Sequence, residues 1–407
     1  MMTWRIGTVI STGRAWRGAL ELEVTLDRPL PGRAAEGTAD GAAGPVTVRA
    51  LAYTDLVGQP AAGDALLLNV SALARGLGTG GYALVVGPAA AGTQLPADPP
   101  VGPGHLVKAR YTPLQSMVLG VDEQESPHHA VLADADSLDG MPVVVADLHS
   151  ALPAVVAGLR HAAAASGRDP GDLQIAYVMT DGGALPAAFS RTVAALRDTS
   201  WLTTCVTVGQ AYGGDLEAVT VHTGLLAARH VAGCDVAVVA QGPGNLGTGT
   251  RWGYSGVAAG EAVNAAATLT GRPVASLRVS GADPRDRHLG ISHHSLTAYG
   301  RVALAPADVP VPVPTTDVEN LPAWGPDLTR RIHEQATALA TPTARHTLVD
   351  VPADTTLLET LRTSPAGLRT MGRGLDADPA SFVAAAVAGI HAHQLATTTD
   401  PAPDTAP

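Results

Sequence analysis

The chain is nearly without lysine. Of its 407 residues, 26 are Lys or Arg, and Lys108 is the only lysine. A phosphate-binding loop of the G-K-[ST] type is therefore excluded, because Val107 and Ala109 flank Lys108. Lys108 is also the only side chain that could form a lysine Schiff base. Other cationic contacts to an anionic ligand must come mainly from arginine.

Positive charge and cysteine are also scarce. The 37 acidic residues give a formal net charge of −11, and no basic run is present, so we expect no nucleic-acid binding. Cys205 and Cys234 are too few for a cysteine-based zinc or iron–sulfur site or for a disulfide framework. No apolar run reaches the roughly 18 residues of a membrane span, and the start lacks a signal-peptide pattern. We expect a cytoplasmic protein that binds no membrane.

Residues 1–90 are predicted to form a small antiparallel β-barrel of the SH3-like or OB type. Turn residues separate five short apolar or alternating segments, at 4–10, 19–26, 46–53, 64–70 and 81–86. Barrels of this kind bind nucleic acid or peptide in many proteins. The negative net charge of the chain favours a second interpretation, in which this barrel is a structural module.

Residues 105–305 are predicted to form a Rossmann-like, mainly parallel sheet flanked by helices. Five near-continuous apolar runs, most of them followed by a helix-like stretch, lie at 142–146, 174–180, 203–208, 235–240 and 273–279. Continuous apolar runs indicate strands that helices cover on both faces. Right-handed crossovers bring the loops after such strands to the carboxyl edge of the sheet, where open parallel sheets bind their ligands.

The last hundred residues are predicted to add a linker and helices. Val and Pro alternate at 309–314, which argues against a central strand, so residues 306–326 are interpreted as a Pro-rich linker. Helices are expected within 327–396, near 327–340, 355–362 and 379–395, packing on the α/β domain. Residues 397–407 are expected to be disordered.

The glycine-rich loop 241–251 is the strongest candidate for ligand binding. Glycines let the backbone approach a ligand closely, and free amides before a helix start near Gly256 form an anion site. Arg251 could add a bidentate contact to the anion. Arg285 and Arg287, in the loop after the predicted strand at 273–279, could form a second contact to it. The predicted ligand-binding residues are Gly242, Gly244, Asn245, Gly247, Thr248, Gly249, Arg251, Arg285 and Arg287.

Two alternatives stay open for these segments. The G-x-G-x-x-G spacing at 242–247 also fits a dinucleotide site, and a tight loop without a ligand fits the same glycines. The charge run at 283–287 is equally typical of a solvated loop.

Carboxylates and histidines follow several of the predicted strands. Asp147, His149 and Asp181 are the predicted catalytic residues, as acid–base groups or metal ligands. A divalent metal is a candidate cofactor, and its predicted ligands are Asp147 and His149 with Asp181, His222, His288 or His293. The alternatives are helix capping by the two aspartates and hydrogen-bonded, partly buried side chains for His149 and for His294.

Four segments together resemble a known family. They are Gly-Leu-Gly-Thr-Gly-Gly-Tyr at 76–82, Lys-Ala-Arg-Tyr-Thr-Pro-Leu-Gln at 108–115, Asp-Leu-His-Ser at 147–150 and Gly-Pro-Gly-Asn-Leu-Gly-Thr-Gly-Thr at 242–250. In combination they resemble an uncharacterised, mainly actinobacterial family that is known only as a domain of unknown function. The resemblance spans nearly the whole chain and implies no established activity.

A second resemblance covers one loop. Residues 242–256 are similar to a glycine-rich stretch of the substrate-binding subunits of glycine reductase. The chain has no paired redox cysteine or selenocysteine motif, so that chemistry is not carried over.

The sequence therefore predicts that a small anionic ligand, with phosphorylated molecules among the candidates, binds at the carboxyl edge of the sheet. Hydrolysis or group transfer is the predicted reaction class. The alternatives are a non-enzymatic metabolite-sensing or regulatory protein and an oxidoreductase-like subunit. A homo-oligomer is compatible with each of them.

Overall fold

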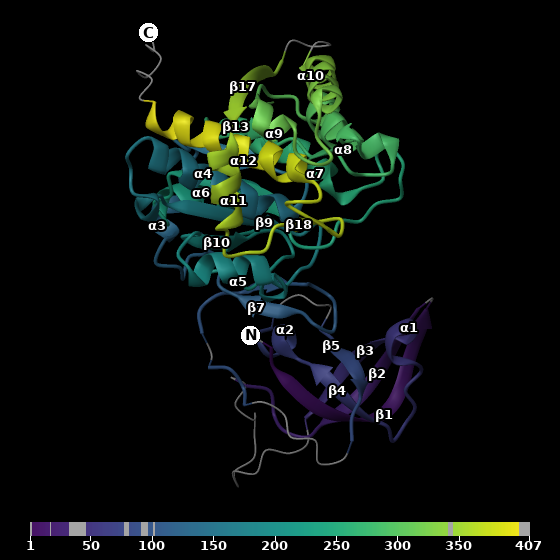
Figure 1. Ribbon diagram of the computed structural model, residues 1–407. Coiled ribbons are helices and arrows are strands. Elements are labelled where there is room, and N and C mark those ends of the chain that lie inside the picture. The colour runs from purple at the N-terminus through teal and green to yellow at the C-terminus, as the bar shows by residue number, and fades with distance from the viewer. Residues whose placement is uncertain are drawn as a thin grey trace. The chain divides into compact units, whose positions relative to one another are not determined.

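The computed structural model describes residues 2–16, 18–31, 46–76, 81–90, 97–100, 102–340 and 345–398. The chain divides into two compact units, Met1–Pro127 and His128–Pro407 (Figure 1). The first unit thus extends beyond residue 90, and the second starts at His128, later than the predicted boundary at residue 105. Residues 399–407, which make up most of the predicted disordered tail, lie outside the described residues.

The first unit contains the predicted small barrel. Its strands are β1 (Trp4–Trp16), β2 (Ala19–Leu26), β3 (Thr47–Tyr53), β4 (Ala65–Asn69) and β5 (Ala83–Pro88). The strand order is β1-β2-β3-β5-β4, and β4 pairs back with β1 to close the barrel. Only β3 and β5 pair in parallel. The structure therefore confirms a small closed barrel in this part of the chain.

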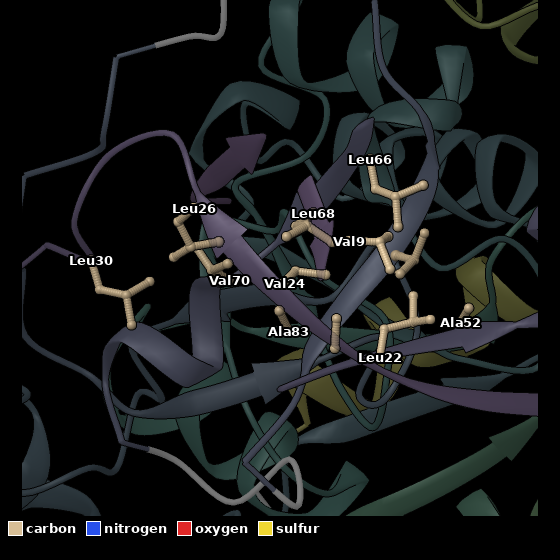
Figure 2. Close-up of a cluster of buried hydrophobic side chains, with 12 residues drawn as sticks. Val9, Leu22, Val24, Leu26, Leu30, Ala52, Leu66, Leu68, Val70 and Ala83 are labelled. Carbon is tan, nitrogen blue, oxygen red and sulfur yellow. The ribbon is translucent and has the colours of Figure 1, made fainter. Parts of the chain in front are cut away.

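Alternate residues of the barrel strands point inward and form its core. Val24, Leu68 and Val85 are fully buried, and Leu22 is 2% exposed. Figure 2 shows this cluster of apolar side chains between the strands. The period of two is what a closed sheet with one apolar face requires. The barrel is therefore stabilised by its own hydrophobic core.

Short elements complete the first unit. They are α1 (Thr54–Val57), α2 (Ser71–Ala74) and the hairpin of β6 (Leu106–Lys108) with β7 (Ser116–Val118). Asn69 of β4 donates hydrogen bonds from Nδ2 to the carbonyl oxygens of Pro113 and Gln115, which ties this hairpin to the barrel. Lys108 is only 2% exposed, so the single lysine is a buried residue of the first unit.

The second unit is built on one parallel sheet of eight strands. The strands are β8 (Pro142–Val145), β9 (Ile175–Thr180), β10 (Thr204–Thr207), β11 (Leu216–Glu217), β12 (Val236–Gln241), β13 (Arg272–Ala275), β16 (Asp308–Pro314) and β17 (Thr347–Ala353). Their order is β11-β10-β9-β12-β8-β13-β16-β17, and every neighbouring pair is parallel. Each of the five predicted apolar runs overlaps one of these strands, which confirms the parallel-sheet prediction.

Helices cover both faces of this sheet. The connecting helices are α4 (Leu152–Ala165), α5 (Arg191–Asp198), α6 (Val221–His230), α7 (Ala258–Thr268), α8 (His293–Thr297) with the π-helical turn η6 (Ala298–Val302), and α10 (Pro326–Ala340). The connections through α4 and α5 run in one direction along the sheet, and those through α6, α7, α8 and α10 run in the other. Right-handed crossovers therefore place the two groups on opposite faces.

Three further helices belong to this unit: α3 (His129–Leu132), α9 (Thr316–Glu319) and α11 (Thr355–Arg362). The last helix, α12 (Pro379–Thr397), packs against α4 and is buried from Pro379 to His393 apart from Ser381 (Figure 1). Such an all-round apolar helix is typical of a core position. Among the described residues, no helix is long and apolar enough to cross a membrane.

The Val–Pro segment was wrongly predicted as a linker, because it forms the sheet strand β16. Pro310, Pro312 and Pro314 alternate with valines, so their missing N–H groups all point to the same side of the strand. β16 pairs with β17 along its whole length, but with β13 only at Val274 and Asp308. A proline-rich strand fits here because the side on which the prolines lack N–H donors faces β13, and β16 forms almost no hydrogen bonds with that strand.

Candidate functional site

At the carboxyl edge of the eight-stranded sheet, protein side chains fill the space beside the ends of β8 and β12. β8 and β12 are neighbours, and the chain leaves them in opposite directions, which is the usual ligand position in such sheets. Here the Gln241 side chain donates from Nε2 to the carbonyl oxygen of Asp147 (3.0 Å) and to Asn245 Oδ1 (2.9 Å). A Cβ atom on Gly256 would lie 2.8 Å from the same carbonyl oxygen. The cavity left at this point is about 20 Å³, too small for a metabolite.

Three histidines meet beside this point, after β13. His288 ends the 3₁₀ turn η5 (Asp286–His288), and His293 and His294 open α8, which Ser292 caps through the His294 amide. One ring nitrogen from each histidine lies within 4.8 Å of the other two. The ring centroids are 4.4 to 5.1 Å apart. Among the described residues, no other group of three His, Cys, Asp or Glu side chains comes this close.

Hydrogen bonds hold two of these rings from outside. His288 Nδ1 lies 2.7 Å from Ser292 Oγ. His294 Nδ1 lies 2.9 Å from Arg278 Nη1 and 3.4 Å from Asp147 Oδ2. Because a guanidinium only donates, His294 Nδ1 accepts from Arg278 in this state. Two of the rings are therefore oriented by protein partners.

Tyr254 completes the packing of the cluster. Its ring stacks on His294 with centroids 3.7 Å apart, and its hydroxyl donates to the His294 carbonyl oxygen (2.7 Å). The glycine-rich loop thus supplies one wall of the histidine cluster.

Two histidines of the cluster, His288 and His293, have lowered pKa values. Burial lowers the pKa of His288 to about 3, and the nearby Arg278 and Arg285 add to this. Burial, followed by the neighbouring His294, lowers the pKa of His293 to about 4. The Nε2 atom of His293 is buried and has no hydrogen-bond partner. Neutral imidazoles with free lone pairs are the form that binds a metal ion.

An arginine-lined cleft adjoins the histidine cluster. It has a volume of about 620 Å³, and its lining includes Arg251, Arg287, Arg301 and His293. No ion pair is found for these three arginines within the described part of the chain. A cleft of this size with several guanidinium groups and no carboxylate in its lining is suited to a small anion.

Two amides of the glycine-rich loop are used by hydrogen bonds within the protein. The Thr248 amide donates to the Gly253 carbonyl oxygen (2.7 Å), and the Gly242 amide donates to Thr180 (3.0 Å). Gly247 bridges Tyr254 in antiparallel fashion, so the loop is a hairpin that carries Arg251 near its tip. The predicted amide cradle is therefore wrong for Gly242 and Thr248.

Other members of the loop have structural roles. Asn245 accepts from Gln241 and from Ser255 through Oδ1. Gly244 and Gly249 have φ angles of 96° and 81°, which favour glycine. The loop contributes Arg251 and, through Gly249, a close approach to the Arg287 guanidinium, 3.5 Å from the position that a Cβ atom would occupy.

Arg285 is paired with a carboxylate of its own loop. Its Nε and Nη2 atoms donate to the two oxygens of Asp283, each at 2.9 Å. Asp283 is 5% exposed and also pairs with Arg373 (3.2 Å). Arg285 therefore has an acidic partner and is not among the residues that line the cleft, whereas Arg287 does line it.

The remaining predicted residues do not join the histidine cluster. Asp181 accepts from the Gln210 amide (2.8 Å), so it satisfies a loop amide. His222 is exposed in the first turn of α6. His149 lies among Ser190, Tyr177 and the carboxyl end of β12. Of the predicted metal ligands, the structure brings together only Asp147, His288 and His293, with His294 in addition.

His149 is held by a chain of hydrogen bonds with a defined direction. Tyr177 donates from its hydroxyl to the Gln241 carbonyl oxygen (2.9 Å), so it must accept from His149 Nδ1 (3.0 Å). His149 Nε2 then accepts from Ser190 Oγ (2.7 Å). Burial lowers the pKa of His149 to about 4, which agrees with this neutral form.

Replacing Ser190 tests this chain. Ser190 also caps α5 by accepting from the Val193 amide (3.0 Å). Ser190→Ala should lower the free energy of unfolding by about 2 kcal/mol, because it removes a cap and leaves His149 Nε2 without a donor. Chemical denaturation measures the change. Thr220→Ala, which removes only the cap of α6, should cost about 1 kcal/mol, and equal losses for the two variants would contradict the role of His149.

Three contributors were not among the predicted site residues. His294 directly follows His293 in the sequence but was not included among the predicted metal ligands. Arg278 follows β13 and lies near the end of the apolar run predicted at 273–279, so its position was a usable signal. Arg301 lies in η6, beyond the predicted loops in the sequence, and carries no such signal.

The fold and the site define an α/β protein with a five-stranded barrel in one unit and, in the other, a buried histidine cluster beside an arginine-lined cleft. The chain belongs to the family described as "Protein of unknown function (DUF3866)", whose model matches residues 49–389. This confirms the resemblance to a family of unknown function. Neither the curated proteins nor the solved structures contain a match.

Proposed function

We propose that this protein binds a small anionic ligand in the cleft lined by Arg251, Arg287, Arg301 and His293. The observation that carries the proposal is that three arginines, without an acidic partner among the described residues, line one cleft of about 620 Å³. Guanidinium groups repel one another unless an anion lies between them, and their planar donors match phosphate and carboxylate oxygens in pairs. A phosphorylated metabolite is the ligand class that best uses all three.

The reaction class proposed with this ligand is hydrolysis or group transfer. His293 belongs to both the cleft and the histidine cluster, so a bound anion would lie beside imidazole groups that can transfer protons or bind a metal. A non-enzymatic metabolite sensor would use the same cleft without turnover. Release of phosphate from phosphate esters by the purified protein would favour the enzyme, and binding without release would favour the sensor.

Thiol redox chemistry is disfavoured. Cys205 and Cys234 are both free and buried. Burial raises the pKa of each thiol to about 12, so neither forms a thiolate at neutral pH. An oxidoreductase-like function would have to use another group. Two buried, unpaired cysteines agree with the proposed cytoplasmic location.

Arginine variants test the anion site. Arg251→Ala and Arg287→Ala should each weaken the binding of inorganic phosphate or pyrophosphate about 10-fold or more, because a hydrogen bond to a charged group contributes about 1.5–3 kcal/mol. Titration calorimetry with these two anions, followed by a panel of sugar phosphates and nucleotides, measures the effect.

Arg330→Ala is the matched control. Arg330 lies on α10 and pairs with Asp327 and Glu334, outside the residues that line the cleft. Its replacement should leave anion binding unchanged. Equal affinities for the wild type and the two cleft variants would show that the anion site is wrongly assigned.

A further inference from the structure

We propose that His288, His293 and His294 bind one divalent transition-metal ion, and that Asp147 is the carboxylate partner that orients His294. This inference goes beyond the anion cleft, and the binding of the metal does not depend on it. The ion belongs to the class that prefers imidazole nitrogen, such as Zn²⁺, Fe²⁺ or Co²⁺, and not to the oxygen-seeking class of Mg²⁺ and Ca²⁺.

The spacing of the rings fits one ion. With a Zn–N distance of about 2.1 Å, two imidazoles on a tetrahedral ion have ring centroids roughly 5 Å apart and nitrogens roughly 3.4 Å apart. The observed centroids are 4.4, 4.9 and 5.1 Å apart, and the ring nitrogens lie within 4.8 Å of one another. Small side-chain rotations are therefore enough to bring three nitrogens onto a shared ion.

The cluster is costly to form without a ligand. His288 and His294 are 4% and 6% exposed, and His293 Nε2 is buried without a hydrogen-bond partner. A buried polar atom without a partner costs about 1–3 kcal/mol. A metal ion would satisfy that nitrogen and the two others at once.

The outer nitrogens of His288 and His294 lie near the kinds of partner that metal-bound histidines use. A histidine that binds a metal through one nitrogen donates the N–H of the other to a hydroxyl or carboxylate oxygen. His288 Nδ1 lies 2.7 Å from Ser292 Oγ, which leaves its Nε2 atom for the ion. For His294, the corresponding acceptor is Asp147 Oδ2, at 3.4 Å from Nδ1.

Asp147 provides an independent observation that points to the same ligand. Its side chain is 3% exposed, and Oδ2 has no hydrogen-bond partner in the structure. When an ion occupies His294 Nε2, the ring proton must lie on Nδ1, where Asp147 Oδ2 is the acceptor. Arg278 now donates to that nitrogen and lies 3.7 Å from Asp147 Oδ2, so it would pair with the carboxylate instead.

The ion would lie at the wall of the arginine-lined cleft, since His293 lines that cleft. Three protein ligands leave a coordination position open, which is typical of catalytic metal sites. We assign that position to an oxygen atom of the bound anion. This second part rests on the proposed function, whereas the three-histidine site does not.

Cobalt titration tests the metal site. Tag-free, full-length protein is stripped with a chelator and titrated with Co²⁺, whose visible absorption reports on coordination by histidine. We expect saturation at one ion per chain and loss of the signal in His293→Ala. This variant is the main test because His293 is only half-buried and its removal should leave the fold intact, which circular dichroism verifies.

Two further variants make the test specific. Asp147→Asn should bind Co²⁺ about 10–100-fold more weakly, as expected for the loss of an orienting partner. His222→Ala removes an exposed histidine of α6 and should bind as the wild type does. Absence of stoichiometric binding, or equal binding by the wild type and a folded His293→Ala variant, would overturn the site.

A titration with phosphate tests the binding of the anion to the metal separately from the three-histidine site. Adding inorganic phosphate to the Co²⁺-loaded protein should change the visible spectrum of the wild type, but not that of an Arg251→Ala, Arg287→Ala double variant. A stoichiometric cobalt spectrum that phosphate leaves unchanged would overturn the assignment of the anion to the open position and leave the three-histidine site standing.

Discussion

Gly158→Ala is expected to destabilise the protein by about 3 kcal/mol, although alanine is the better helix former. Gly158 lies in the middle of α4, where it meets α12. A Cβ atom at this position would lie 2.0 Å from the Ala386 carbonyl oxygen, and one on Gly389 would lie 2.1 Å from the Val155 carbonyl oxygen. Because backbone atoms face both glycines, only a separation of the two helices can relieve the overlap.

The sign of this change distinguishes packing from helix propensity. In an exposed helix, alanine in place of glycine stabilises by about 1 kcal/mol, so propensity alone predicts a gain. Gly300→Ala in η6 is the control, since the nearest atom to its added Cβ lies 3.7 Å away. Urea denaturation of both variants measures the difference. A Gly158→Ala midpoint at or above that of the wild type would show that α4 and α12 do not meet through these glycines.

The parallel sheet could be predicted because its signal is local. Each central strand is a short run of apolar residues without alternation, and Val143, Val144 and Val145 of β8 are all fully buried. Helices on both faces impose that pattern on every strand they cover. The same argument fails for β16. Its prolines are tolerated because the strand on their side, β13, forms almost no hydrogen bonds with β16. The sequence does not show which strand is the neighbour on that side.

The candidate site was harder to predict than the sheet. Loops at one edge were expected to converge, and His288 and His293 do so with Asp147. The sequence does not show which polar groups are used locally, as Asp181 is by the Gln210 amide and Arg285 by Asp283. A residue type at the correct edge is therefore only a candidate until its local hydrogen bonds are known.

The glycine-rich loop lies at the candidate site, but not for the reason that the sequence suggested. Its glycines were expected to expose amides to an anion, but the hairpin between Gly247 and Tyr254 uses part of that backbone internally. What the loop contributes is Arg251 and the Tyr254 ring on His294. Glycine is needed there for the tight turns that position these two side chains.

Acid is expected to unfold the protein well above the pH at which carboxylates titrate. Burial lowers the pKa of His149 to about 4, and it also lowers the pKa values of His346 and His393. In the unfolded chain these histidines have a pKa of about 6.5, so the unfolded state binds more protons as the pH falls below that value. The contribution of His149 is complete above pH 6.5 and decreases towards pH 4, by up to about 1.4 kcal/mol per pH unit. The contributions of His346 and His393 decrease in the same direction as the pH falls.

Denaturation midpoints between pH 7.5 and pH 4.5 test this prediction and assign part of it to one residue. His149→Gln removes one depressed pKa while keeping a side chain that can hydrogen-bond to Ser190 or Tyr177, so the stability of this variant should depend less steeply on pH. His222→Gln removes an exposed histidine and should leave the slope as in the wild type. If His149→Gln kept the full slope, His149 would have to be protonated in the folded protein, and Ser190 could not be donating to its Nε2 atom.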